Sequence, residues 1–483
     1  MPVHPDLPPG RLPIKLDATS NGEFAPVPLD AAARHARTLA QSAVEEARRR
    51  LGMSRRRYLV SLLGAAATLG AFNRGFAAAG RRGGAYELAP EAPYELAAAQ
   101  AAIGGEELIF DVQLHHVNPQ GAWRRRASPE AFKGMPNSGC GQADHIECFS
   151  SGALLKDVFM DSDTAIGVLS HVPGGADDNP LDFEAAAATR RAAAALDGSE
   201  RLLLHGRCMP TLAGEIEAMA AQAERFPVAA FKTYTQFGPP GGAAGFRLDD
   251  DRHGTPFIDA ARRLGVRRIA VHKGLAFGAR GFEFSLADDV GPAARKHRDM
   301  SFLIYHAGFD TGTKEGPYDP KARAGVDVLI RSMRAAGQPD NVYAELGSTW
   351  RFVMRDPDQA AHLLGKLLLS FGEDRILWGT DSVWYGSPQD QIQAFRAFQI
   401  SREFQQRYGY PALTPQIKRK IFGLNAARVY GIDPVPLQRR LASDAVQRQR
   451  AEYANDPKPS FATYGPRTRA EFQALRRLAG ERP

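Results

Sequence analysis

Short apolar runs alternate with amphipathic stretches along most of the chain from residue 107 onward. The apolar runs predict eight strands, at 107–112, 164–169, 201–204, 228–232, 268–272, 302–306, 341–346 and 375–379. Helical periodicity lies between most of them, at 184–196, 212–225, 257–264, 286–297, 322–336 and 357–371. Strands that alternate with helices form a parallel sheet, and eight such units close into a barrel. The sequence therefore predicts an α/β fold, a (β/α)8 TIM barrel over 107–432.

The segments around this barrel follow from the same pattern. A linker is expected at 80–106, and helices at 388–408 and 415–430 complete the barrel region. From residue 433 to 483 the chain is polar and rich in arginine, which predicts a C-terminal helical arm. The connection over 114–163 is long and rich in Gly, Pro, Asn and Ser, so we expect it to cover the barrel mouth.

The first 79 residues have the pattern of an export signal. Arg55 and Arg56 precede an uncharged apolar stretch, and small residues follow at 77–79. This order resembles a twin-arginine (Tat) signal peptide with an extended n-region. The apolar stretch is about 15 residues, shorter than the roughly 20 that span a bilayer, so no permanent membrane anchor is expected. An uncleaved anchor and a buried helix are the alternatives.

Several expectations depend on this signal. The Tat machinery would be a partner, the protein would be periplasmic or otherwise exported, and residues 1–79 would be absent from the mature protein. Either Met53 is the true start or 1–52 are a real n-region, and a helix is predicted at 29–51.

Charge and cysteine content narrow the remaining possibilities. Residues 1–82 hold 13 Lys and Arg against 6 Asp and Glu, whereas the rest of the chain holds 48 of each kind. The body of the protein therefore gives no electrostatic reason to expect nucleic-acid binding. Cys140 and Cys148 flank a histidine without the spacing of a zinc site. Free or buried thiols are favoured, and a local disulfide is the alternative.

Four polar residues close predicted strands, and they carry the candidate chemistry. His115, His272, His306 and Asp381 follow the runs ELIFDVQLH, RRIAVH, SFLIYH and RILWGTD. The carboxyl ends of barrel strands meet at one mouth, where imidazoles and a carboxylate can hold a divalent metal. Zinc is favoured and manganese is the alternative. Such an ion lowers the pKa of bound water and creates a nucleophile for hydrolysis.

Neighbouring positions add weaker candidates. Asp111, Gln113 and His115 alternate along one strand, so they share one face. Gln113 stands where a second imidazole would complete a His-x-His pair, and it is a weaker, neutral ligand. Lys232 ends the fourth strand, and His171 and His205 follow the second and third. We expect Lys232 to contact substrate or a carboxylate rather than to bridge two metals, and the two histidines are secondary candidates for substrate contact.

These residues resemble the amidohydrolase-related family, amidohydrolase family 2 of the metal-dependent hydrolases. RILWGTD and YHAG resemble its strand-8 and strand-6 signatures, and the segment from Ile421 to Gly431 resembles its closing helix. The resemblance covers about 108–432. It implies a barrel with one divalent metal, with His115, His272 and Asp381 as ligands and His306 as the catalytic acid or base. Gln113 departs from the His or Glu usual there.

Four functions remain open from the sequence. The first is a metal-dependent hydrolase of a small organic amide, ester or lactone, in which Asp381 also accepts a proton from water. The second is a non-oxidative decarboxylase of an aromatic or unsaturated acid. The third is a metal-independent lactonase that uses Asp381 and His306, and the fourth is an inactive ligand-binding barrel. The substrate is a small molecule in each case, and a homo-oligomer is compatible with the sequence.

Overall fold

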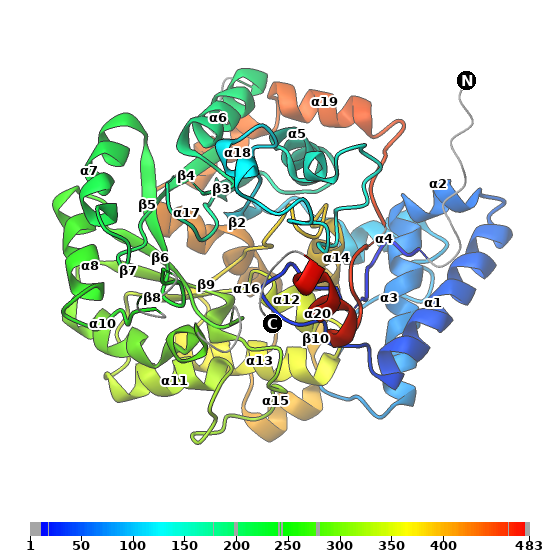
Figure 1. Ribbon diagram of the computed structural model, residues 1–483. Helices are drawn as coiled ribbons and strands as arrows, with labels where there is room; N and C mark the ends of the chain where they lie inside the picture. Colours follow the sequence, from blue (N-terminus) through cyan, green and yellow to red (C-terminus); the bar gives the residue numbers. More distant parts are fainter. Residues whose placement is uncertain are drawn as a thin grey trace.

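The structure is a computed structural model, and it describes residues 11–17, 19–176, 178–197, 201–239, 242, 245–276, 281–461 and 463–478. Eight parallel strands lie side by side in chain order and form a nearly closed barrel (Figure 1). Their bounds are β2 (Phe110–Leu114), β3 (Ile166–Leu169), β4 (Leu202–Arg207), β5 (Val228–Tyr234), β6 (Arg268–His272), β7 (Ser301–Tyr305), β8 (Val342–Glu345) and β9 (Ile376–Leu377). The predicted TIM barrel is confirmed.

The first and last strands approach one another through the segment that follows β9. The Val112 N–H donates to the Trp378 carbonyl over 3.1 Å, and the Asp381 N–H donates to the Gln113 carbonyl over 3.0 Å. The Val383 N–H continues this ladder to the His115 carbonyl at 3.1 Å. These bonds place the polar residues after β9 directly beside those that end β2.

Helices cover the outside of the barrel and pack apolar faces onto the strands. They are α6 (Phe183–Asp197), α7 (Glu215–Arg225), α8 (Gly254–Arg263), α10 (Val290–Lys296), α11 (Val326–Ala335) and α13 (Pro357–Phe371), with the short α9 (Phe282–Ser285) and α12 (Thr349–Val353) in the connections. α13 shows why these segments are helical. Asp356 caps its first turn by accepting from the Asp358 and Gln359 N–H groups, and Pro357 occupies its first position. Its leucines at 363, 364, 367 and 368 are buried.

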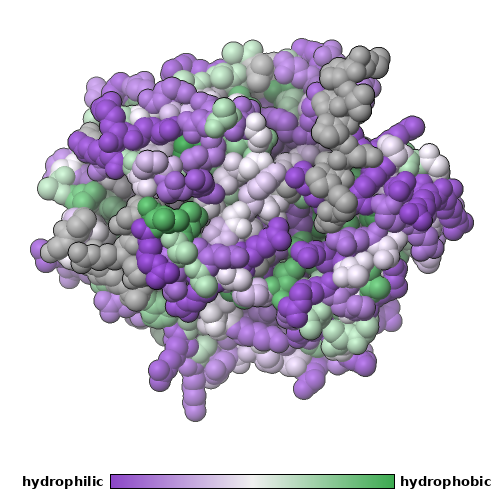
Figure 2. Space-filling model, turned by 45° about the vertical axis from the view of Figure 1, so that its right-hand side comes forward, coloured by the Kyte–Doolittle hydropathy of each residue, from purple (hydrophilic) through white to green (hydrophobic). Residues whose placement is uncertain are grey.

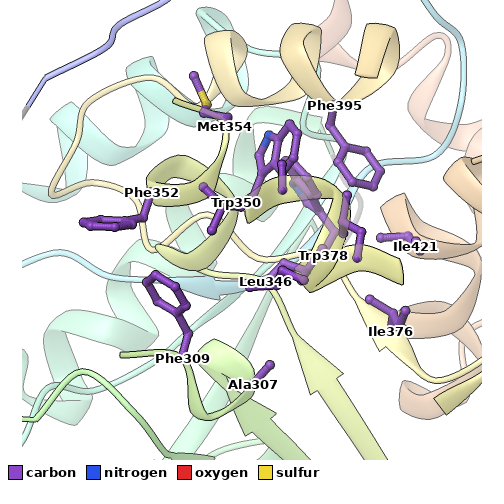
Figure 3. Packing of buried hydrophobic residues seen from close by; sticks show 14 of the residues in the cluster. Ala307, Phe309, Leu346, Trp350, Phe352, Met354, Ile376, Trp378, Phe395 and Ile421 are labelled. Atoms are coloured by element: carbon purple, nitrogen blue, oxygen red, sulfur yellow. The ribbon is translucent and has the colours of Figure 1, made fainter. Parts of the chain in front are cut away.

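An aromatic cluster joins the last barrel strand to the helices that follow it. Trp350 of α12 and Trp378 after β9 both point toward Phe395 (Figure 3), with ring centroids 5.1 and 5.2 Å from it. Phe395 belongs to α14 (Gln389–Ala397), which is followed by β10 (Phe398–Ile400), α15 (Arg402–Tyr408), α16 (Pro415–Arg419) and α17 (Asn425–Tyr430). The cluster therefore fixes the segment that carries Asp381 against the helical layer.

The N-terminal region packs against one flank of this barrel. It contains α1 (Ala31–Arg50), α2 (Arg55–Leu59), α3 (Leu62–Ala78), β1 (Gly84–Tyr86) and α4 (Leu96–Ile103), drawn in blue in Figure 1. β1 pairs antiparallel with β10, and Tyr86 lies opposite Phe398. α3 is apolar and buries Leu69 and Phe72 completely, in the same hydrophobic cluster as Val44 of α1.

The residues of the predicted export signal take part in this packing. Arg55 pairs with Glu45 and donates to the Arg11 carbonyl over 2.9 Å, and Arg56 donates to the Pro457 carbonyl over 2.6 Å.

The face turned forward in Figure 2 is mostly hydrophilic, with hydrophobic residues in small groups. Among the described residues, no helix combines the length and apolarity needed to cross a membrane. Export and removal of residues 1–79 stay predictions, but residues 11–79 cannot be left out of the fold.

The long connection after β2 is closed by a disulfide. Cys140 and Cys148 are bonded to one another, so the preference for free thiols was wrong. The connection holds η1 (Ala122–Arg125), η2 (His145–Phe149), α5 (Ser151–Leu154) and η3 (Leu155–Met160). Phe132 and Phe149 pack against Trp384, which lies just beyond Asp381, with centroids 5.7 and 5.8 Å apart. The connection thus lies over the barrel mouth.

The described part of the C-terminal arm contains the helices α18 (Pro434–Leu441), α19 (Ala445–Tyr453) and α20 (Arg469–Leu478). α19 is held to the barrel by Arg450, which pairs with Asp163 ahead of β3. Asp163 also pairs with Arg396 of α14 at 2.5 Å. One carboxylate therefore joins the arm, the barrel and the helix that supports the last strand.

Candidate metal centre

The side chain of His115 is fixed by the backbone of the neighbouring strand. His115 follows β2, and its Nδ1 lies 2.8 Å from the Ser170 carbonyl just after β3. A carbonyl can only accept, so Nδ1 carries the proton and donates it. Nε2 then faces the barrel mouth, 3.2 Å from Oδ1 of Asp381. A ring held in this way presents one nitrogen to the centre.

The other two predicted histidines are held in the same manner. His306 donates from Nδ1 to the Gly347 carbonyl over 2.7 Å, and Nε2 of His272 lies 3.3 Å from the Leu275 carbonyl. The opposite nitrogens, Nε2 of His306 and Nδ1 of His272, lie 3.3 Å from one another. Three strands therefore direct three imidazole nitrogens toward one small volume.

Asp381 joins these rings to the rest of the mouth. Its Oδ1 accepts from Nε2 of Gln113 over 3.0 Å, and its Oδ2 accepts from Oγ of Ser348 over 2.6 Å. Gln113 also lies 3.5 Å from Nε2 of His306. The structure brings together Gln113, His115, His272, His306 and Asp381 as the sequence predicts; their roles stay predictions.

The backbone at the centre adopts conformations that L-residues rarely take. His306, Ala307, Ser348 and Asp381 have positive φ angles of 64°, 52°, 54° and 61°. Each such residue costs about 1–3 kcal/mol and persists where the surrounding structure requires it. Three of the four carry polar side chains of the centre, so the turns serve to aim these side chains.

A second carboxyl group lies beneath the centre. Glu345 ends β8 and accepts from the N–H groups of His306 and Gly347 over 3.0 and 2.7 Å. Burial raises its pKa to about 8, although these two bonds oppose the rise. A Cβ on Gly379 would lie 1.6 Å from Oε1 of Glu345, so this position requires glycine. Glu345 therefore holds the two loops that carry His306 and Ser348.

Burial also sets the charges of the imidazoles. It lowers the pKa of His306 to about 4 and that of His272 well below its usual value. Burial raises the pKa of Asp381, but its interactions with His115, His306 and Ser348 outweigh burial, and the pKa lies below the usual value. At neutral pH, His272 and His306 are therefore neutral and Asp381 is ionised.

The weaker candidates lie around this centre rather than in it. Lys232 is buried with its Nζ 3.4 Å from the Tyr305 ring centroid, and this atom has no hydrogen-bond partner among the described residues. Burial lowers its pKa to about 7. His171 lies 2.8 Å from the Leu181 carbonyl through Nδ1, and His205 lies 2.9 Å from the Tyr430 hydroxyl through Nε2. Both histidines thus have partners in the barrel wall.

Two residues of the centre come from outside the predicted barrel. Nδ2 of Asn21 donates to Oδ2 of Asp381 over 2.8 Å, and Oε1 of Glu23 lies 3.6 Å from Nδ1 of His272. The sequence reasoning missed them because the N-terminal 79 residues were set aside as a signal. Ser348 was missed as well, although it follows a predicted strand, which is the signal that identified the others.

Comparison with known proteins gives the family. The model of the family described as amidohydrolase matches residues 153–432. The chain belongs to the amidohydrolase family. The match begins after β2, so Gln113, His115 and the N-terminal region lie outside it. A comparison of this amidohydrolase with curated protein sequences gave no match.

Three solved structures have similar folds. An uncharacterised TIM-barrel protein from Bordetella bronchiseptica is 14% identical, covers 67% of this chain and 98% of its own, and has a TM-score of 0.43. 5-Carboxyvanillate decarboxylase from Sphingomonas paucimobilis is 14% identical, covers 68% of this chain and 99% of its own, and has a TM-score of 0.42. A zinc-bound amidohydrolase from Burkholderia multivorans is 14% identical, covers 68% of this chain and 100% of its own, and has a TM-score of 0.40.

The donor set of this amidohydrolase suits a divalent cation. Ligand atoms of Glu23, His272 and His306 lie within 4.8 Å of one another, and the Nε2 atoms of His306 and His115 both neighbour Gln113. Neutral imidazoles and carboxylates are the ligands that zinc and manganese take. Among the described residues, Oε1 of Gln113 is buried without a partner, and a half-turn of the amide would bring this oxygen to the imidazole side in exchange for the bond from Nε2 to Asp381. The residues present therefore fit a metal ion.

Proposed function

We propose that this amidohydrolase is a metal-dependent hydrolase of a small organic amide, ester or lactone, with zinc as the favoured metal and manganese as the alternative. The observation that carries the proposal is the convergence of three fixed imidazoles and Asp381 at the carboxyl ends of four barrel strands. Gln113, His115, His272 and Asp381 would hold the ion. The ion would supply Lewis acidity and lower the pKa of water toward neutrality.

The remaining chemistry belongs to the side chains. Asp381 is ionised, and its Oδ2 accepts hydrogen bonds from Ser348 and Asn21, so it is held where it can accept a proton from water. His306 keeps Nδ1 protonated against the Gly347 carbonyl, which leaves Nε2 to accept a proton and pass it to the leaving group. Trp384 stacks on His115 with ring centroids 5.4 Å apart, which restricts water on this side of the centre.

Metal analysis of the purified protein tests the proposal first. We expect about one zinc or manganese per chain in the wild type, and loss of it in His272→Ala and Asp381→Ala. His35→Ala is the matched control, because His35 is exposed on α1. Absence of metal from the wild type, with none taken up on addition, would refute metal dependence.

Product analysis separates hydrolysis from its main alternative. A screen of small esters, lactones and amides in ¹⁸O-labelled water should place the label in the product. Release of carbon dioxide with no label in the organic product would identify a decarboxylase instead.

We also propose export through the twin-arginine route, on the strength of Arg55, Arg56 and the apolar stretch that follows. Mass spectrometry of the protein recovered from the periplasm would give both its location and its first residue. A chain found wholly in the cytoplasm would refute export.

A further inference from the structure

An extended segment ahead of α1 reaches into the candidate metal centre. We call residues 11–17 and 19–29 the N-terminal strap. It buries Leu12, Ile14 and Leu16, and in Figure 1 its dark blue trace runs from α1 toward the middle of the molecule. The strap has no regular secondary structure over this length, so its position depends on side-chain contacts with the barrel.

Polar anchors fix the strap over the strand ends. Nζ of Lys15 donates to the carbonyls of Tyr385 and Ser387 over 3.0 and 3.2 Å. Both oxygens of Asp17 accept from Nη2 of Arg351 over 2.8 Å, in a pair whose side chains are both less than 10% exposed. These anchors lie just before the residues that enter the centre.

The tip of the strap brings two polar side chains to the ligand atoms. Asn21 donates through one nitrogen to Oδ2 of Asp381 and to Oε2 of Glu23, both over 2.8 Å. The other oxygen of Glu23 faces Nδ1 of His272 at 3.6 Å. Two donor atoms that bind one metal ion at about 2.0–2.2 Å lie up to about 4 Å apart, so this spacing suits a shared ion.

Gln113 gives a reason for the additional ligand. The first strand offers a neutral amide where the family resemblance implies an imidazole or a carboxylate, and an amide is the weaker donor. We propose that Glu23, carried by the N-terminal strap, ligates the divalent metal and supplies the anionic ligand that Gln113 lacks. This inference rests on the proposed metal-dependent function. It also requires that the strap is not cleaved off and remains part of the active enzyme.

Metal affinity of the full-length protein tests the inference without any substrate. Competition against a chromophoric chelator gives the zinc affinity, and cobalt substitution gives an absorption spectrum that reports the ligand set. Removing a group that hydrogen-bonds to a metal ligand typically lowers metal affinity about 10–100-fold. Glu23 is proposed as a direct ligand, so Glu23→Gln should lower the zinc affinity at least about 100-fold. The cobalt spectrum should change as well.

Two further variants complete the design. Glu46→Gln removes the same charge from an exposed position of α1 and should bind zinc as the wild type does. In Glu23→Gln/Gln113→Glu the new carboxylate on β2 should restore most of the lost affinity. This rescue also separates loss of a ligand from loss of folding, which thermal unfolding of each variant checks independently.

The outcomes distinguish this inference from the proposed function. Tight zinc binding by the wild type, with unchanged affinity and an unchanged cobalt spectrum in Glu23→Gln, would overturn the role of Glu23 and leave metal dependence intact. No zinc binding by the wild type would overturn both. Loss of affinity in Glu23→Gln without rescue by Gln113→Glu would overturn the exchange of roles between the two positions.

Discussion

Asp17 is the residue through which the attachment of the N-terminal strap can be measured. Its carboxylate meets the buried guanidinium of Arg351 in two contacts of 2.8 Å, and it also accepts from the N–H and hydroxyl of Thr19. Asp17→Asn keeps the shape and an acceptor oxygen but leaves the buried Arg351 without this counter-ion. Breaking one side of a buried pair typically costs about 3–5 kcal/mol.

The structure sets the expected size of this effect. Two unit charges about 4 Å apart attract by about 4 kcal/mol at an effective dielectric constant of about 20. Asparagine retains one hydrogen bond to Arg351, which contributes about 1 kcal/mol. We therefore expect the strap to open about 3 kcal/mol more easily in Asp17→Asn, which corresponds to about a 100-fold rise in the open population.

Trypsin cleavage after Lys15 measures this opening. Lys15 is 8% exposed, so cleavage there requires the strap to leave the barrel. When opening is fast relative to cleavage, the rate follows the open population and should rise about 100-fold. Glu46→Gln is the control and should be cleaved at the wild-type rate. Replacing both partners, in Asp17→Leu/Arg351→Met, should cost less than Asp17→Asn because no charge is left unpaired.

Cleavage of Asp17→Asn at the wild-type rate, with an unchanged free energy of unfolding, would refute this reasoning. It would mean that the pair contributes no net attachment. The strap would then be held by its buried apolar side chains and by its other polar contacts, which include those of Lys15 and Asn21.

Three other predictions follow from the structure. Burial raises the pKa of Asp163, but Arg396 and Arg450 outweigh it and lower the pKa from 3.8 to about 2. Because the folded pKa lies below the unfolded one, the stabilisation of about 2 kcal/mol is present above pH 4 and lost as the pH falls toward 2. Urea unfolding of Asp163→Asn should lack this pH dependence, and equal slopes in both proteins would contradict it. Phe72→Ala should lower the free energy of unfolding of the purified enzyme by about 3–5 kcal/mol, since Phe72 is fully buried in α3. No change in urea unfolding would mean that 62–78 are not part of the mature fold. His205→Gln should cost about 1–3 kcal/mol through its hydrogen bond to Tyr430 but retain wild-type metal content, unlike His272→Ala. Loss of metal from His205→Gln would place His205 in the centre.

The barrel half of the centre could be predicted because its signals are local. Each of His115, His272, His306 and Asp381 follows an apolar run, and parallel strands bring their carboxyl ends together. Gln113 could be predicted as well, because residues two apart along a strand share one face and Gln113 precedes His115 by two positions. The tautomers could not be predicted, because they depend on carbonyls such as those of Ser170 and Gly347, which follow other strands.

The N-terminal half of the centre lacked such a signal. Asn21 and Glu23 lie in an irregular polar stretch, and the paired arginines and apolar run that follow are typical of a segment removed after export. In the fold the same apolar run becomes α3, whose buried residues pack against α1. An apolar helix of this length has the same sequence pattern whether it is a signal or a buried helix, so periodicity alone could not decide between them.

The sequence by itself determined the strands, the order of the barrel and the side chains at its mouth, because hydrophobic periodicity and strand polarity are encoded residue by residue. Tertiary structure alone decided that Asp381 bonds to Asn21, 360 positions away in the chain, and that Glu23 faces His272. The strap has no periodic pattern of its own. Its path is selected by contacts with Arg351, Tyr385 and Ser387, which exist only once the barrel has formed.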